Sequence, residues 1–342
     1  MKIVIDRNIP FAAGPLAEVA EVVSLPGDAI SREALRDADA LITRTRTRCD
    51  ASTLADTAVS FVGTATIGTD HIDLPYCRDH GIEVANAPGC NAPAVAQWLM
   101  AAVSAWLPEG KPLSDLTIGV VGAGHVGQIV IRWARGLGMN VLVCDPPRAE
   151  AEGASRAYPY VSLDRIAAEA DVITFHTPLT REGAHPTFHL ADRAFLSALR
   201  RRPLLLNAAR GPVADNAALV EALDSGLLSA VGIDCWEGEP AISDALLDRA
   251  LVATPHIAGY SREGKIRATQ MVLDALARHF SLPPLAADAE SPKPVAETVS
   301  PDTIDYDILA DSRALKAAPH DFELLRNTYP LRPESRDAST IA

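Results

Sequence analysis

The sequence lacks the features that would place it in several broad classes of protein. No apolar run approaches the roughly 20 residues that a bilayer-spanning helix needs, and the start, MKIVIDRN, has the pattern of a buried strand rather than a signal peptide. Basic residues are in deficit, 31 against 44 acidic ones, for a formal net charge of −13. This acidity argues against nucleic acid or an anionic membrane as the main partner.

Cysteine is also scarce, and its spacing is uninformative. The five cysteines form no CxxC pair and no metal-ligand pattern; they are Cys49, Cys77, Cys90, Cys144 and Cys235. We therefore expect free thiols in a reducing cytoplasm and no metal site. The sequence shows no repeat with a period of 20–50 residues either, so a repeat architecture is not expected.

What the sequence does contain is two series of short apolar runs that alternate with helical patterns. The first series is KIVID, AEVVSL, ADALITRT and SFVGTAT. The second is LTIGVVGAG, NVLVCDPP, ADVITFHTP, PLLLNAARG, LSAVGIDCW and ALVATPHIAG. The alternation predicts an α/β protein with parallel sheets. Because the second series is apolar throughout, both faces of its sheet should be covered by helices, as in a doubly wound fold.

The segment IGVVGAGHVGQ carries a dinucleotide-binding pattern. It is a strand followed by Gly122-x-Gly124-x-x-Gly127 and then a helix that opens with His125 and Val126. The glycines allow a tight turn, close approach of a pyrophosphate to the backbone, and close helix–strand packing. The helix N-terminus offers unpaired N–H groups to the phosphates.

An acidic residue lies where this pattern needs one. Asp145 ends the next apolar run, eighteen residues after Gly127. A carboxylate there accepts hydrogen bonds from an adenosine ribose and repels a 2′-phosphate, so NAD is expected rather than NADP. Arg148, three residues further on, is placed to compensate in part for such a phosphate.

Three further segments each end an apolar run of the second series. They contribute Arg210 (LLLNAARGP), Asp234 and Glu239 (VGIDCWEGEP), and His256 (VATPHIAGY). Ligands of open α/β sheets bind outside the carboxyl ends of the strands. A histidine base, a carboxylate that orients it and an arginine for a substrate carboxylate suit hydride transfer at a hydroxyl-bearing carbon. Taken singly, each residue also has a structural interpretation.

The domain organisation follows from these patterns. We expect a Rossmann-type NAD-binding domain over residues 98–255, inserted in a flavodoxin-like substrate-binding domain made of residues 1–97 and 256–282. A helix should run from Asn91 to about Trp106 and another from Arg262 to Phe280. Residues 283–342 form a proline-rich linker and a C-terminal region, a candidate for dimerisation that is too short for a core of its own.

The stretch TRTRTRCD at residues 43–50 has the two-residue period of a strand. That period predicts Arg44, Arg46 and Arg48 on one face and the threonines on the other. Two interpretations stay open. One is a charged edge strand that resists unwanted pairing, and the other is a socket for a small anion.

Across roughly residues 40–280 the sequence resembles the D-isomer-specific 2-hydroxyacid dehydrogenase family, through GxGxxG with a distal Asp, NAARG, IDCWEGEP and TPHIAGY. The resemblance implies a catalytic trio of Arg210, Glu239 and His256, with the acid five residues beyond Asp234 preferred over Glu237. It also implies cofactor contacts from Thr177, Ala208, Asp234 and Gly259, and substrate contacts from Thr45, Thr66 and Tyr260.

A narrower resemblance lies in FVGTATIGTDHID, NAPGCNAPAVAQW, CDPPRA, FHTPLT, DCWEGEP and TPHIAGYSREGK. These segments are similar to homodimeric members of the family that oxidise 4-phospho-D-erythronate with NAD⁺ in pyridoxal 5′-phosphate (vitamin B6) biosynthesis. On that basis Arg44 and Thr45 are expected to anchor the phosphate, with Arg46 a weaker candidate and Arg48 a surface charge. The alternatives are a phosphoglycerate dehydrogenase, a hydroxypyruvate reductase, or a non-catalytic NAD-sensing protein.

Overall fold

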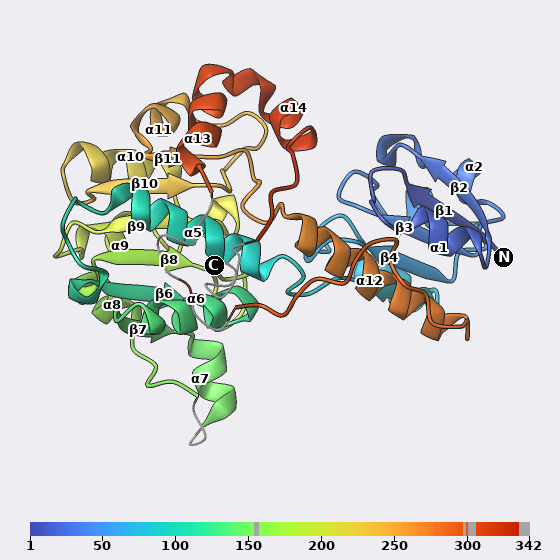
Figure 1. Ribbon diagram of the computed structural model, residues 1–342, viewed down its shortest axis with the longest axis horizontal. Coiled ribbons are helices and arrows are strands. Elements are labelled where there is room, and N and C mark those ends of the chain that lie inside the picture. The colour runs from blue at the N-terminus through green and yellow to red at the C-terminus, as the bar shows by residue number, and fades with distance from the viewer. Residues whose placement is uncertain (154–156, 297–298, 300–305, 335–342) are drawn as a thin grey trace, which may run out of the picture. The chain divides into compact units, whose positions relative to one another are not determined.

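The computed structural model describes residues 1–153, 157–296, 299 and 306–334. Contacts divide the chain into two units (Figure 1). Unit 1 is Met1–Asn91 with Ser261–Pro294, and unit 2 is Ala92–Tyr260 with Val295–Ala342. The sequence-based boundaries at 97/98 and 255/256 differ from these divisions by five or six residues. Of the expected C-terminal region, residues 297–298, 300–305 and 335–342 lie outside the described residues.

Unit 1 is built on a parallel five-stranded sheet with the order β2-β1-β3-β4-β5, the flavodoxin-like order. Its strands are β1 (Lys2–Asp6), β2 (Glu21–Leu25), β3 (Ala40–Thr43), β4 (Phe61–Thr64) and β5 (Glu83–Ala85). Its helices are α1 (Ala13–Ala17), α2 (Arg32–Leu35), α3 (Ala51–Leu54), α4 (Leu74–Asp79) and α12 (Arg262–His279), with a 3₁₀ turn at Gly27–Ala29. The predicted α12 is confirmed to within one residue.

Unit 2 is built on a parallel six-stranded sheet with the order β11-β10-β9-β8-β6-β7. Its strands are β6 (Thr117–Val121), β7 (Asn140–Cys144), β8 (Val172–Phe175), β9 (Leu204–Asn207), β10 (Ala230–Ile233) and β11 (Val252–Ala253). Every residue of β6, β8, β9 and β10 is buried. The expectation of an apolar sheet covered on both faces is therefore confirmed.

The described helices of unit 2 lie before, between and after these strands in the chain. They are α5 (Ala92–Trp106), α6 (His125–Gly136), α7 (Pro146–Glu152), α8 (Leu163–Glu169), α9 (Arg193–Ser197), α10 (Asn216–Asp224), α11 (Asp244–Arg249), α13 (Ile308–Ala317) and α14 (Phe322–Asn327). Within the described residues, 3₁₀ turns lie at Leu113–Asp115, Gly211–Val213 and Pro319–Asp321. Helix α5 is buried almost throughout, as its apolar sequence predicts. Among the described helices, none is long and apolar enough to span a membrane.

The prediction of a strand through TRTRTR was wrong. Strand β3 ends at Thr43, whose partner in β4 is Thr64, and residues 44–48 form a turn and an irregular stretch. The ladder ends where the buried apolar run ALIT ends, because the residues that follow bring no apolar side chains to pack on the sheet. Thr47 instead donates its hydroxyl to the carbonyl of Gly27 at 2.8 Å.

The strand order of unit 2 reverses beside β6. The chain passes from β6 to β7 at one edge and then to β8 on the other side of β6. Such a switch point at the carboxyl ends of parallel strands is where doubly wound sheets bind ligands. Gly122, Asp145 and His176 directly follow β6, β7 and β8 at this edge.

Candidate active site

The glycine-rich turn has the geometry that a dinucleotide needs. A Cβ atom at Gly127 would lie 2.0 Å from the carbonyl oxygen of Gly122, so only glycine allows α6 to pack this closely on β6. A Cβ at Gly124 would meet nothing within 4 Å, which leaves the backbone open to a ligand there. His125 and Val126 begin α6, a helix of 12 residues whose N-terminus favours phosphate.

Asp145 and Thr177 lie near the glycine-rich turn, at the carboxyl ends of β7 and β8. Asp145 Oδ2 accepts the amide of Ala123 at 2.8 Å, and its Oδ1 caps α7 through the amide of Arg148 at 3.1 Å. The hydroxyl of Thr177 is buried and has no hydrogen-bond partner among the described residues. Because buried hydroxyls normally have a partner, this orphan oxygen and the open Gly124 backbone fit a bound dinucleotide.

Arg148, which the sequence placed beside the ribose site, is engaged within unit 2. Its guanidinium forms an ion pair with Glu152 and donates to the carbonyl of Ala123 at 2.5 Å. The hydrogen bond that Arg148 donates to the Glu152 carboxylate raises the pKa of Arg148. This arrangement ties the guanidinium to α7 and to the turn after β6. Two further expected cofactor residues, Ala208 after β9 and Gly259 after β11, are half-buried.

Glu239 and His256 form a hydrogen-bonded pair. Glu239 Oε2 lies 2.8 Å from His256 Nδ1, and Glu239 Oε1 accepts the amide of Trp236 at 2.8 Å. Burial by itself raises the pKa of Glu239, but the hydrogen bond and charge of His256 lower it overall. Glu237, the other acid of this loop, bonds instead to His189 Nε2 at 2.6 Å. Glu239 is therefore the carboxylate that orients the imidazole.

Asp234 holds the loop that carries His256. Its Oδ1 accepts the Thr254 hydroxyl at 2.6 Å and the amides of Ile257 and Ala258 at 2.8 and 3.0 Å. His256 itself has φ +57°, a conformation that few non-glycine residues adopt. The buried carboxylate thus fixes a strained backbone at the end of β11, and burial raises its pKa.

Arg210 lies next to the Glu239 loop because two backbones approach each other closely. Arg210 precedes Gly211, where a Cβ would be 2.0 Å from the carbonyl oxygen of Trp236. Asn207 at the end of β9 donates to the Arg210 carbonyl at 2.9 Å, and Arg210 Nη1 donates to Ala209 O at 2.8 Å. The segments with Arg210 and Glu239 are therefore in direct contact.

The structure adds Cys235 to this cluster. The Cys235 sulfur, a carboxylate oxygen of Glu239 and a ring nitrogen of His256 all lie within 4.8 Å of one another. Burial raises the pKa of the Cys235 thiol, and Cys235 Sγ also lies 3.5 Å from the carbonyl oxygen of Ala209. Sequence spacing did not single out this thiol, although it directly follows Asp234 in IDCW.

Arg44, Thr45 and Thr66 belong to unit 1, at the carboxyl ends of the paired strands β3 and β4. Arg44 Nη1 donates to the carbonyl of Asn8 at 3.3 Å, and Thr45 is exposed. The hydroxyl of Thr66 donates to Gly68 O at 2.9 Å. Arg48 pairs with Asp50 at 2.6 Å with its side chain 83% exposed, which is a surface position.

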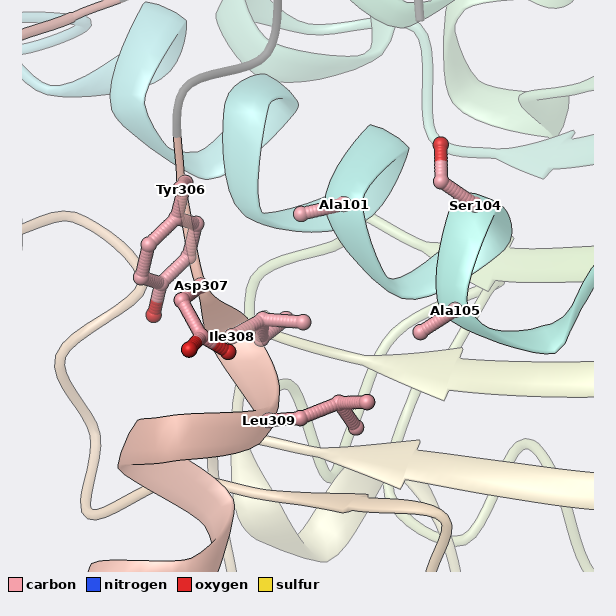
Figure 2. Close-up of a pocket in the computed structure, with 7 residues that line it drawn as sticks. All are labelled: Ala101, Ser104, Ala105, Tyr306, Asp307, Ile308 and Leu309. Carbon is pink, nitrogen blue, oxygen red and sulfur yellow. The ribbon is translucent and has the colours of Figure 1, made fainter.

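A separate pocket of about 280 Å³ lies in unit 2 where α5 meets the start of α13 (Figure 2). Its walls are Ala101, Ser104, Ala105, Tyr306, Asp307, Ile308 and Leu309. None of the expected catalytic, cofactor or substrate residues lines it. The pocket reflects how the C-terminal segment packs on α5 rather than the candidate active site.

Comparison with known proteins points to one family. The NAD binding domain of the D-isomer specific 2-hydroxyacid dehydrogenases matches residues 94–258. The chain is 44% identical to the erythronate-4-phosphate dehydrogenase of Bacteroides thetaiotaomicron, over 100% of this chain and 99% of that protein. Its identity to the Pseudomonas aeruginosa protein of the same name is 48%, over 80% of this chain and 72% of that protein.

Solved structures share the architecture. The TT0316 protein of Thermus thermophilus matches with a TM-score of 0.70 and 30% identity, over 83% of this chain and 98% of that one. An NAD⁺-bound 3-phosphoglycerate dehydrogenase from Entamoeba histolytica matches with a TM-score of 0.68 and 26% identity, over 82% and 95%. Both matches leave about one sixth of this chain uncovered.

Proposed function

Because the chain belongs to the D-isomer specific 2-hydroxyacid dehydrogenase family, we propose that it oxidises 4-phospho-D-erythronate at C2 to (R)-3-hydroxy-2-oxo-4-phosphooxybutanoate. NAD⁺, held at the glycine-rich turn and Asp145, would supply the acceptor for the hydride that leaves C2. The observation that carries the substrate assignment is the 44% identity, over 100% of this chain, to a relative named for this reaction. The chemistry itself is supported by the Glu239–His256 pair.

Each member of the trio has a distinct task. His256 takes the proton of the C2 hydroxyl as the hydride leaves, because a neutral imidazole is a base suited to this pH range. Glu239 holds His256 Nδ1 at 2.8 Å, which fixes the tautomer that exposes Nε2 as the basic nitrogen and stabilises the imidazolium that forms. Arg210 binds the substrate carboxylate through its guanidinium fork.

The phosphate end of the substrate is assigned to unit 1. Arg44 and Thr45 follow β3, next to Thr66 after β4, and a guanidinium matches phosphate oxygens well. Tyr260 is the proposed substrate contact from unit 2. The cofactor contacts are the glycine-rich turn with His125 and Val126, then Asp145, Thr177, Ala208, Asp234 and Gly259.

The decisive experiment is turnover. Purified protein is incubated with NAD⁺ and 4-phospho-D-erythronate while absorbance at 340 nm is followed, with 3-phospho-D-glycerate and D-glycerate in parallel. A strong preference for the four-carbon phosphate supports the proposal. Equal or better use of phosphoglycerate would keep the family and the trio but discard the substrate. Absence of turnover with every 2-hydroxy acid would favour an NAD sensor.

We further propose a cytoplasmic homodimer that serves pyridoxal 5′-phosphate biosynthesis. The five cysteines are free and buried, which suits a reducing compartment. The C-terminal segment exposes Leu324 (58%) and Leu331 (37%), two large apolar side chains suited to a subunit contact. Light scattering coupled to size exclusion tests the dimer: a monomer mass at micromolar concentration would refute it.

A further inference from the structure

The C-terminal segment, residues 306–334, packs on the rest of unit 2 (Figure 1). Helix α13 lies beside β11, an edge strand of the six-stranded sheet, and Ser312 Oγ accepts a hydrogen bond from the amide of Ala253 at 3.0 Å. Leu315 and Phe322 are fully buried in the core of unit 2. The segment therefore covers an edge that would otherwise expose unpaired backbone groups.

From this anchored segment Arg332 reaches the loop that follows the catalytic histidine. Its side chain is almost fully buried, with the residue 8% exposed. It donates to the carbonyl oxygens of Ile257 at 3.0 Å, Ala258 at 2.5 Å and Tyr260 at 3.0 Å. The same guanidinium donates to Ala94 O in α5 at 3.1 Å.

The peptide groups beside His256 are consequently held from two sides. Asp234 accepts the amides of Ile257 and Ala258, and Arg332 donates to the carbonyls of the same two residues. One clamp comes from the end of β10 and the other from the C-terminal segment. Between them they fix the backbone that holds His256 at its positive φ.

Tyr260 is contacted by the C-terminal segment at three points. Arg332 binds its carbonyl oxygen, and the ring of Tyr329 meets its ring edge-on with 6.3 Å between the centroids. Arg326 of α14 hydrogen-bonds its hydroxyl. The Arg326 side chain is only 18% exposed, and its charge also acts on Glu239. Arg326 therefore contacts the proposed substrate residue Tyr260, and its charge reaches the Glu239 carboxylate.

We propose that the C-terminal segment is a working part of the active site of its own chain. Arg332 is a positioning residue for the His256 loop, and Arg326 is a positioning residue that acts through the Tyr260 hydroxyl. The oxidation proposed above supplies the assay, so the inference rests on that function for its kinetic test. A purely dimerising segment would need neither of these contacts.

The kinetic test is a double-mutant cycle of Arg326→Ala and Tyr260→Phe. Each single variant should lower kcat/KM for the preferred 2-hydroxy acid by about 10- to 100-fold, because small misplacements at a reacting centre are costly. The double variant should lose no more than the worse single one, since both remove the same hydrogen bond. Free guanidinium should restore part of the activity of Arg326→Ala, and KM for NAD⁺ should stay within twofold.

Arg313→Gln is the matched control. Arg313 lies on α13 of the same segment, with its side chain 69% exposed and 3.6 Å from Asp307, so its loss should leave kcat/KM unchanged. Additive losses in the cycle, or an Arg326→Ala variant within twofold of wild type, would overturn the role of Arg326. If Arg326→Ala does not fold, Arg326→Lys, which keeps the charge but loses the planar fork, replaces it in the cycle.

Hydrogen exchange tests the role of Arg332 without any turnover. In Arg332→Lys the amides of Ile257 and Ala258 should exchange at least tenfold faster than in wild type, while the strands of unit 1 stay unchanged. Unaltered exchange at these two amides would refute the clamp. Since this readout needs no substrate, it stands or falls separately from the proposed oxidation.

Discussion

The pairing of Glu239 with His256 predicts how a single substitution shifts the pH dependence of the reaction. Burial lowers the pKa of His256, but the Cys235 thiol and the Glu239 carboxylate beside it raise the pKa well above 6.5 overall. In the oxidative direction His256 starts neutral, so kcat/KM falls as pH drops through this raised pKa. Glu239→Gln keeps the shape of the side chain and removes its charge. The acid limb should therefore move to lower pH.

The size of the effect follows from the geometry. An opposite charge within about 4–6 Å shifts a pKa by roughly 1–3 units, and the two groups are 2.8 Å apart. The side chains are 31% and 19% exposed, so solvent screens part of the interaction. We expect a shift of about 1–2 units. Loss of a charge-assisted hydrogen bond, about 1.5–3 kcal/mol, should also reduce the pH-independent kcat/KM by roughly 10- to 100-fold.

The assay is initial-rate formation of NADH at 340 nm between pH 5.5 and 10, with wild type and Glu239→Gln compared at subsaturating substrate. Glu237→Gln is the matched control, because Glu237 lies in the same loop as Glu239 but pairs with His189 instead of His256. Its acid limb should coincide with that of wild type. An unshifted profile for Glu239→Gln would remove Glu239 from the mechanism, and a shift to higher pH would reverse the proposed electrostatics.

Two further predictions concern the phosphate and the fold. Arg44→Ala should raise KM for the phosphorylated substrate about tenfold with little change in kcat. Arg48→Ala, which removes a side chain that is 83% exposed, should leave KM unchanged. If steady-state assays give Arg44→Ala the same KM as wild type, the phosphate assignment is discarded. Gly127→Ala should lower the free energy of unfolding by about 3 kcal/mol or prevent folding, since its Cβ would be 2.0 Å from a carbonyl oxygen. Gly124→Ala, with open space at its Cβ, should unfold in urea like wild type while binding NADH more weakly.

The sequence by itself was sufficient to predict most of the strands and the two long helices α5 and α12. The apolar runs coincide with strands β1–β4 and β6–β11, and the helices expected near Asn91–Trp106 and Arg262–Phe280 are present as α5 and α12. Periodicity and helix capping involve residues close together in the chain, so they can be recognised without the fold. The same holds for the glycine-rich turn and for the segments NAARG, WEGEP and TPHIAG.

Only the tertiary structure decided which of those polar groups meet. The resemblance had already preferred Glu239 to Glu237, and the structure adds the contact of Glu239 with His256, the separate contact of Glu237 with His189, and Cys235 beside the first pair. It also ended β3 at Thr43, because strand pairing and not alternation fixes where a strand stops. A period of two in the sequence describes a strand and a polar turn equally well when no apolar face accompanies it.

The C-terminal segment shows most clearly what could not be predicted from the sequence. Helix α13 was not predicted, although Asp307 caps it and Ile308 and Leu315 are buried along it. Arg326 and Arg332 lie about 70 residues beyond His256, after a proline-rich stretch, and nothing local connects them with its loop. Their place beside Tyr260 depends on α13 packing against β11, a contact between distant parts of the chain. The sequence thus determined the elements and the candidate catalytic residue types, and long-range packing decided which distant side chains lie against them.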